Sequence, residues 1–293
     1  MHNKIKTISS VLKNSSRLFL ENDPLKMAGA TAFFTMFALP PILIILLQVL
    51  SLFIDPKMIR HELFISLSDM FGQEAVRQIA SVIRAVRKLS YNWMATILVF
   101  IFLLFVATTV FKIIRSSINQ IWNIAKPSGK KKIIVSLQSR LQSLVVIFVT
   151  GLLFTVGIFI EAVQVFIGNY FLKLFPDISA LFNQLLAFTT STLITAIWFL
   201  IIFRYLNDSR PKWNIAWAGA LFTSLLFSIG KIILHLLLTY NNINNIYGAS
   251  ASIILLLLFV FYSAMILYYG AAFTKMWGQY KGYDIVGTEK KND

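Results

Sequence analysis

Six long apolar segments constrain this 293-residue chain more than any other feature. They lie at roughly 28–54, 93–111, 141–168, 181–203, 215–238 and 248–273. About 20 apolar residues in a helix cross the hydrocarbon core of a bilayer, and none of the six segments alternates as a barrel strand does. Apolar residues make up 57% of the chain, against about 45–50% in soluble domains. The sequence therefore predicts an all-α membrane protein with six transmembrane helices.

The basic residues are spread unevenly and predict which side of the membrane each segment occupies. The formal net charge is +15, and most of the 27 lysines and arginines lie in the two tails and in the loops 112–140 and 204–214. Positively charged loops favour the cytoplasmic side and attract anionic lipids. Both termini are therefore expected to be cytoplasmic. This explanation of "KPSGKKK" (126–132) makes a nucleic-acid partner unnecessary, and none is expected.

The chain divides into a cytoplasmic amphipathic segment (1–26), a six-helix transmembrane domain (27–277) and a polar cytoplasmic tail (278–293). The first segment is predicted to be an interfacial helix, because Ile5, Ile8, Leu12, Ser15 and Phe19 share one helical face. The alternative is a frayed polar tail. A second amphipathic helix is expected in the outer loop 55–92, either capping the bundle or serving as a solvated connector.

Three stretches resemble the YihY/BrkB family of bacterial inner-membrane proteins. They are "DPLKMAGATAFFTMFALPP" (23–41), "FKIIRSSINQIW" (111–122) and the region 204–277, which includes "YGASAS" and "FYSAMILYYGAAF". The resemblance implies six helices, cytoplasmic termini and a role in the cell envelope. Members have been described as envelope-integrity or virulence factors, as transporters or exporters, and formerly as ribonuclease BN.

Three positions depart from the usual pattern of that family. Phe34 stands where members often have Tyr, Ala38 where they have Ser, and Ala272 where they have Glu. Each departure removes a polar group. If the family uses that glutamate in its mechanism, this chain lacks it or relies on another residue.

Ionisable residues within the apolar segments are the best candidates for a functional site, because placing charge in a membrane is costly. Glu161, Lys231 and His235 are such residues, and Lys231 and His235 share a helical face at a spacing of four. We expect a Glu161–Lys231 pair, with His235 and Gln164 nearby, to line an outward-facing cavity. The alternative is that Glu161 reaches the interface, Lys231 snorkels and the two never meet.

Two further features bear on this cavity. The uncharged turn "TYNNINNIYGASAS" (239–252) joins the last two apolar segments. A plain turn is the simpler explanation, and Asn241, Asn244, Asn245 and Tyr247 are candidates for the outer rim of the cavity. Pro40 and Pro41 remove backbone donors inside the first segment and predict a helix break or a bend. Broken helices mark the binding sites of many transporters.

Small residues recur every four positions along the fifth segment, at Ala216, Ala220, Ser224 and Ser228. Such faces allow helices to approach closely. We expect them to serve packing within the chain, and a homo-oligomer is the alternative.

Sequence motifs for enzymatic activity are absent. The chain has three histidines and no cysteine, and it contains neither a phosphate-binding P-loop nor a zinc-protease helix. No cofactor and no catalytic residue are expected. The sequence favours a transporter or exporter-like protein for an amphipathic or anionic solute or lipid. The alternatives are a non-transporting envelope or lipid-organising scaffold and, more remotely, a ribonuclease.

Overall fold

The computed structural model describes residues 2–50, 93–124, 131–174, 176–240 and 251–285, with a few isolated positions between 65 and 81. Over these residues the chain is helical and contains no strand. Its elements are α1 (His2–Leu20), α2 (Pro24–Leu50), α5 (Trp93–Ile121), α6 (Lys131–Leu174), α7 (Pro176–Ile201), the π-helical turn η2 (Ile202–Leu206), α8 (Trp213–Tyr240) and α10 (Ala251–Tyr280). The prediction of an all-helical protein is confirmed.

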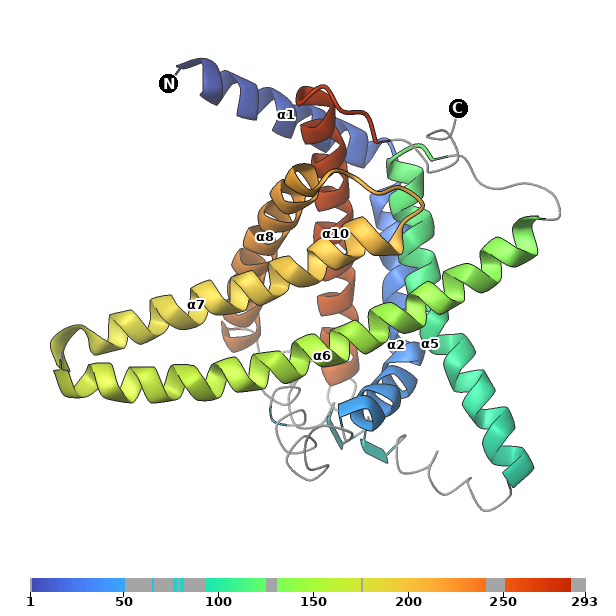
Figure 1. The fold of residues 1–293 in the computed structure, drawn as a ribbon, viewed down its shortest axis with the longest axis horizontal. Coiled ribbons are helices and arrows are strands. Elements are labelled where there is room, and N and C mark those ends of the chain that lie inside the picture. Colours follow the sequence, from blue (N-terminus) through green and yellow to red (C-terminus); the bar gives the residue numbers. More distant parts are fainter. Residues whose placement is uncertain are drawn as a thin grey trace.

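Helix α10 lies at the centre of the arrangement and packs against α1, α2, α5 and α8. Helices α6 and α7 form a long hairpin that crosses the other helices obliquely, and its far end projects beyond them (Figure 1). Helix α7 packs against both α6 and α8. The start of α1, the ends of α5 and α10 and the loop 207–212 lie at one end of the bundle, which we call the terminal face (Figure 1).

Local sequence explains where several helices begin and end. Pro24 and Pro176 occupy the first positions of α2 and α7, where the missing N–H is not needed. After α5, Asn123 adopts a positive φ of 57°, and the next residue, Ile124, donates its N–H to the carbonyl of Asn119 at 2.9 Å. This is a left-handed helix terminator.

The hydrophobic core is centred on aromatic side chains near the terminal face. Trp122 is buried and donates its indole N–H to the carbonyl of Ala271 at 2.9 Å. Tyr268 is buried as well, and its hydroxyl lies 2.5 Å from the Thr31 hydroxyl. Both polar groups are therefore satisfied inside the core, and they connect α5 and α2 to the central helix.

Helices α8 and α10 approach closely through a reciprocal pattern of glycine and threonine. A Cβ atom on Gly219 would lie 2.0 Å from Thr274 Oγ1, and one on Gly270 would lie 1.9 Å from Thr223 Oγ1. Both threonine hydroxyls donate to carbonyls of their own helices at 2.7 Å. The small residues of α8 follow the same logic, since all four predicted positions are buried within the chain, namely Ala216, Ala220, Ser224 and Ser228.

Within the described residues, four helical segments are long and apolar enough to cross a membrane. They are Arg140–Gly157, Leu181–Leu206, Trp213–Ile233 and Ile253–Tyr280. Large apolar side chains on the described helices also face outward, among them Phe37, Ile101 and Phe166. Lipid is the solvent that suits such a surface. The protein is thus an integral membrane protein with several apolar helices.

Several helix boundaries differ from the sequence prediction. Helix α5 continues from the expected end at 111 to Ile121, and α6 spans Lys131–Leu174 instead of 141–168. Much of the predicted loop 112–140 is therefore helical. Hydropathy detects where a helix meets hydrocarbon, whereas the hydrogen-bonded helix continues through polar residues. The predicted helix in 55–92 lies almost wholly outside the described residues.

The N-terminal segment forms the predicted helix. In α1, Val11 and Ser15 are buried, and the Ser16 hydroxyl lies 3.1 Å from the hydroxyl of Tyr269 on α10. Phe19 packs edge-on against the same tyrosine, with ring centroids 5.4 Å apart. Helix α1 is therefore attached to the bundle by its own contacts.

Candidate functional site

A buried ionic network lies near the terminal face. Arg115 on α5 forms an ion pair with Asp208, which follows η2, and donates to Gln142 Oε1 on α6 at 2.5 Å. Asn119 donates its side-chain amide to the same carboxylate, and it accepts the backbone N–H of Asp208 at 3.3 Å. Arg115 and Asn119 lie one turn apart on α5, so one helix face holds the carboxylate with two donors.

The sequence prediction missed this network. Arg115 and Asp208 are separated by 93 positions, and both were assigned to solvated cytoplasmic loops. The available signal was the spacing of Arg115 and Asn119 within "FKIIRSSINQIW", which places an arginine and an amide on one helix face.

A second polar contact lies between α7 and α8, within the apolar segments. The Lys231 ammonium donates to Ser191 Oγ at 3.2 Å and lies 5.6 Å from the centroid of the Phe227 ring. One turn away, the hydroxyls of Thr192 and Ser228 are 3.0 Å apart and buried. The sequence "TTST" at 189–192 thus supplies neutral hydroxyl partners for α8, as is common between membrane helices.

Glu161, the predicted partner of Lys231, lies on α6 and not on α7, the helix that carries the Ser191 hydroxyl. Glu161 and Gln164 belong to α6, and α7 packs between α6 and α8. The side chains of Glu161 and His235 lie outside the described set, so their pairing with Lys231 stays a prediction. Gln164 is half-buried in α6. Lys231 contacts Ser191, a hydroxyl that the prediction did not name as its partner.

The remaining predicted site residues have separate outcomes. Asn241, Asn244, Asn245 and Tyr247 lie outside the described residues, so the outer rim stays a prediction. Pro40 and Pro41 lie inside α2, which is assigned as one helix from Pro24 to Leu50. A complete break is therefore not found, because a helix can bend and continue past a proline when the freed carbonyls are satisfied elsewhere.

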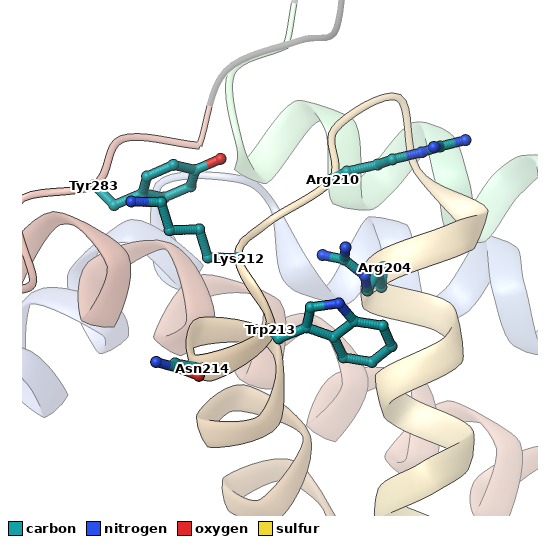
Figure 2. Close-up of a pocket in the computed structure, with 6 residues that line it drawn as sticks. All are labelled: Arg204, Arg210, Lys212, Trp213, Asn214 and Tyr283. Carbon is teal, nitrogen blue, oxygen red and sulfur yellow. The ribbon is translucent and has the colours of Figure 1, made fainter.

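A basic pocket opens at the terminal face beside the ionic network. It has a volume of about 430 Å³ and is lined by Arg204, Arg210, Lys212, Trp213, Asn214 and Tyr283. Figure 2 shows the Arg204 guanidinium over the Trp213 indole, with Lys212 reaching toward Tyr283. The Arg204 Cζ lies 4.2 Å from the Trp213 ring centroid, and the Lys212 ammonium lies 4.8 Å from that of Tyr283.

Comparison with known proteins places the chain in a family. The family model described as "Virulence factor BrkB" matches residues 16–292, which is nearly the whole sequence. The chain belongs to the BrkB family. The resemblance recognised in the sequence is thereby confirmed.

Two curated relatives of this BrkB-family chain are UPF0761 membrane proteins. The protein from Psychromonas ingrahamii is 25% identical over 261 residues, covering 87% of this chain and 83% of its own length. The protein from Mannheimia succiniciproducens is 26% identical over 263 residues, covering 89% and 86%. No solved structure matches the chain significantly.

The three departures from the usual pattern lie in different surroundings of this BrkB-family structure. Ala38 and Ala272 are buried in the core, whereas Phe34 is exposed on α2. Position 272 lies in the apolar core, one turn of α10 from the buried Lys275. Alanine places no charge at this site.

The described residues contain no group of three or more histidine, aspartate or glutamate side chains that could hold a metal ion. The polar groups described between the apolar helices α7 and α8 are the Lys231 ammonium and the hydroxyls of Ser191, Thr192 and Ser228. Such groups recognise an anion or bind other helices.

Proposed function

We propose that this protein is a multi-pass inner-membrane transporter or exporter-like protein for an anionic or amphipathic solute, with a role in the cell envelope. The observation that carries the proposal is Lys231, whose ammonium lies between two apolar helices. Ionisable groups within membrane helices are costly and typically mark solute or ion pathways.

The contacts of Lys231 suit a substrate-binding cation. Its described partners, Ser191 and the Phe227 ring, are both uncharged, so neither neutralises the ammonium. A carboxylate or phosphate of a solute would supply the missing charge. Glu161 on α6 is the proposed competing partner, which would hold Lys231 when solute is absent.

Flux into proteoliposomes tests this role. Candidate anionic metabolites and lipids would be compared for wild type, Lys231→Met, Lys231→Arg and Glu161→Gln. Transport should fall at least about tenfold in Lys231→Met, because a charged hydrogen bond to the substrate is lost, and Lys231→Arg should retain part of it. Equal flux in wild type and Lys231→Met would remove this residue from the mechanism.

The proposed topology has six spans, with α2 and α5 as the two beyond the four already identified. Helix α2 has 27 residues and α5 has 29, and both pack on the central α10. Lengths above 20 residues suffice to span. The basic residues of both tails favour the cytoplasmic side.

Cysteine labelling tests this topology directly, because the natural chain has no cysteine. Single variants Lys13→Cys and Lys281→Cys both place a thiol at an exposed position on the terminal face. A membrane-impermeant maleimide should label them in inside-out vesicles and leave them unlabelled in intact spheroplasts. Labelling of either position from the outside would overturn the proposed orientation.

A second candidate function is a non-transporting scaffold that organises lipids or the envelope. The closely packed α8–α10 contact favours it, because the Gly219–Thr274 and Gly270–Thr223 pairs leave little room for relative movement. The two functions separate experimentally. If the protein is a scaffold, the Lys231→Met variant expressed in a deletion strain should restore envelope integrity. If it is a transporter, the same variant should fail to restore it.

A further inference from the structure

The basic pocket at the terminal face has the composition of an anion-binding site. Arg204, Arg210 and Lys212 line it, and no acidic side chain is among its lining residues. Asp208 is the only acidic residue in the segment 204–214, and its carboxylate is already bound by Arg115 and Asn119. The ionic network therefore occupies the one carboxylate of this segment, and Asp284, which follows Tyr283, accepts a bond from Gln279 at 3.3 Å.

The backbone around the pocket adds to its preference for an anion. Helix α8 begins at Trp213, so its positive end and its first N–H groups lie at the pocket. The chain enters this helix through the Lys212 carbonyl, which accepts the N–H groups of Ile215 and Ala216 at 3.0 and 2.9 Å. The N–H groups of Trp213 and Asn214 precede these bonds, in the part of a helix that has no intrahelical acceptor.

Two local structures hold the side chains of the pocket in place. The π-helical turn η2 carries Arg204, whose guanidinium donates to the carbonyl of Pro211 and lies over Trp213. On the opposite side, Gly282 adopts a φ of 69° just after α10. The turned chain then lets the Tyr283 N–H donate to the carbonyl of Gly278 at 2.9 Å, which sets the tyrosine ring against Lys212.

Aromatic side chains place this pocket at the depth of lipid headgroups. Tyr205 and Trp213 are each 47% exposed, and Tyr280 is 52% exposed. Tyr205 lies in η2, Trp213 begins α8 and Tyr280 ends α10. Tryptophan and tyrosine with one polar end concentrate where hydrocarbon meets water. Basic pockets between membrane helices at this level suit phosphate-bearing headgroups.

We propose that this pocket binds the phosphate group of an anionic membrane lipid, with Arg204, Arg210 and Lys212 as its cations. The volume of about 430 Å³ holds a phosphate and part of a glycerol headgroup. The site is independent of the proposed transport function, since it needs no pathway through the membrane. A bound lipid would attach η2, α8 and the segment after α10 to the same leaflet.

The test measures binding by full-length protein in a neutral detergent. Soluble short-chain phosphatidylglycerol, phosphatidylcholine of the same chain length and inorganic phosphate are titrated separately by calorimetry. The test variant is Arg210→Gln with Lys212→Gln, both of which are exposed positions. The control variant is Lys13→Gln with Lys26→Gln, which removes the same charge from exposed positions outside the pocket.

The proposal expects phosphatidylglycerol to bind about tenfold more tightly than phosphatidylcholine, and the test variant to lose at least about tenfold of that affinity. The control variant should retain it, and both variants should melt as wild type does. Three results would overturn the proposal. They are equal affinity for the two lipids, equal loss in both variants, and binding of inorganic phosphate that matches and displaces phosphatidylglycerol, which would identify free phosphate as the ligand.

Discussion

Two charged regions share the short segment between η2 and α8, yet their arginines have opposite surroundings. Arg115 reaches Asp208 with a side chain that is 8% exposed, and Gln142 and Asn119 complete the hydrogen bonding. Arg204, four residues before Asp208, lies over Trp213 at the wall of an open pocket. The first region connects three segments of the fold, whereas the second leaves its cations available to a ligand.

The surroundings of the two arginines differ because Asp208 and Arg204 face different helices. Asp208 faces α5, which supplies Arg115 and Asn119 from one helical face. The Arg204 side faces the start of α8 and the residues after α10, which supply aromatic rings and a lysine. The attraction within a buried ion pair offsets its desolvation only when the geometry is good and further hydrogen bonds satisfy its polar atoms, whereas cations in an open pocket keep their hydration.

The largest effect is expected from Asp208→Ala. This substitution leaves Arg115 buried with its charge unpaired, which typically costs about 3 kcal/mol, and somewhat less here because the Asp208 side chain is 30% exposed. The melting temperature of the full-length protein in detergent should fall by several degrees. The control is Asp284→Ala, since that carboxylate is exposed and accepts an exposed bond from Gln279 at 3.3 Å. Equal melting of wild type and Asp208→Ala would show that the network does not stabilise the fold.

The sequence predicted the features that depend on local periodicity. Apolar length located the long helices, because a membrane segment must satisfy its own backbone hydrogen bonds as a helix. A spacing of four small residues located the buried face of α8, including Ala216 and Ala220. Helices α5 and α6 extend beyond the predicted apolar segments, since hydropathy does not report where polar residues continue a helix.

Features that depend on which helices become neighbours were not predictable. The Arg115–Asp208 pair required α5 to lie beside the segment after η2, and nothing in either stretch alone specifies that arrangement. The contact between Lys231 and Ser191 on α7 was likewise not predicted, whereas the expected pairing of Lys231 with Glu161 on α6 stays a prediction. The family match covers nearly the whole chain, and it identifies relatives without supplying these contacts.

A smaller effect is expected from Gly282→Ala on the pocket side. Alanine at a φ of 69° is strained, at a cost of about 1 kcal/mol, and relief of this strain would move Tyr283 away from Lys212. Affinity for phosphatidylglycerol should fall several-fold while the melting temperature changes little. Gly29→Ala is the matched control, because an added Cβ there meets nothing within 4 Å. If Gly282→Ala lowers the melting temperature strongly but changes the affinity for phosphatidylglycerol little, Gly282 serves the stability of the fold and not the pocket.

The smallest effect is expected from Trp213→Ala, which removes the ring beneath Arg204. A cation–π contact at a partly exposed site is worth about 0.5–1 kcal/mol, so affinity for phosphatidylglycerol should fall about two- to fivefold. Trp217→Ala is the control, since Trp217 lies one turn further along α8 and does not line the pocket. Trp213 contacts Arg204, whereas Arg115 and Asn119 bind Asp208 in the ionic network. A change in melting temperature as large as that of Asp208→Ala would therefore mean that the two regions act as one structural unit, and the pocket would lose its separate role.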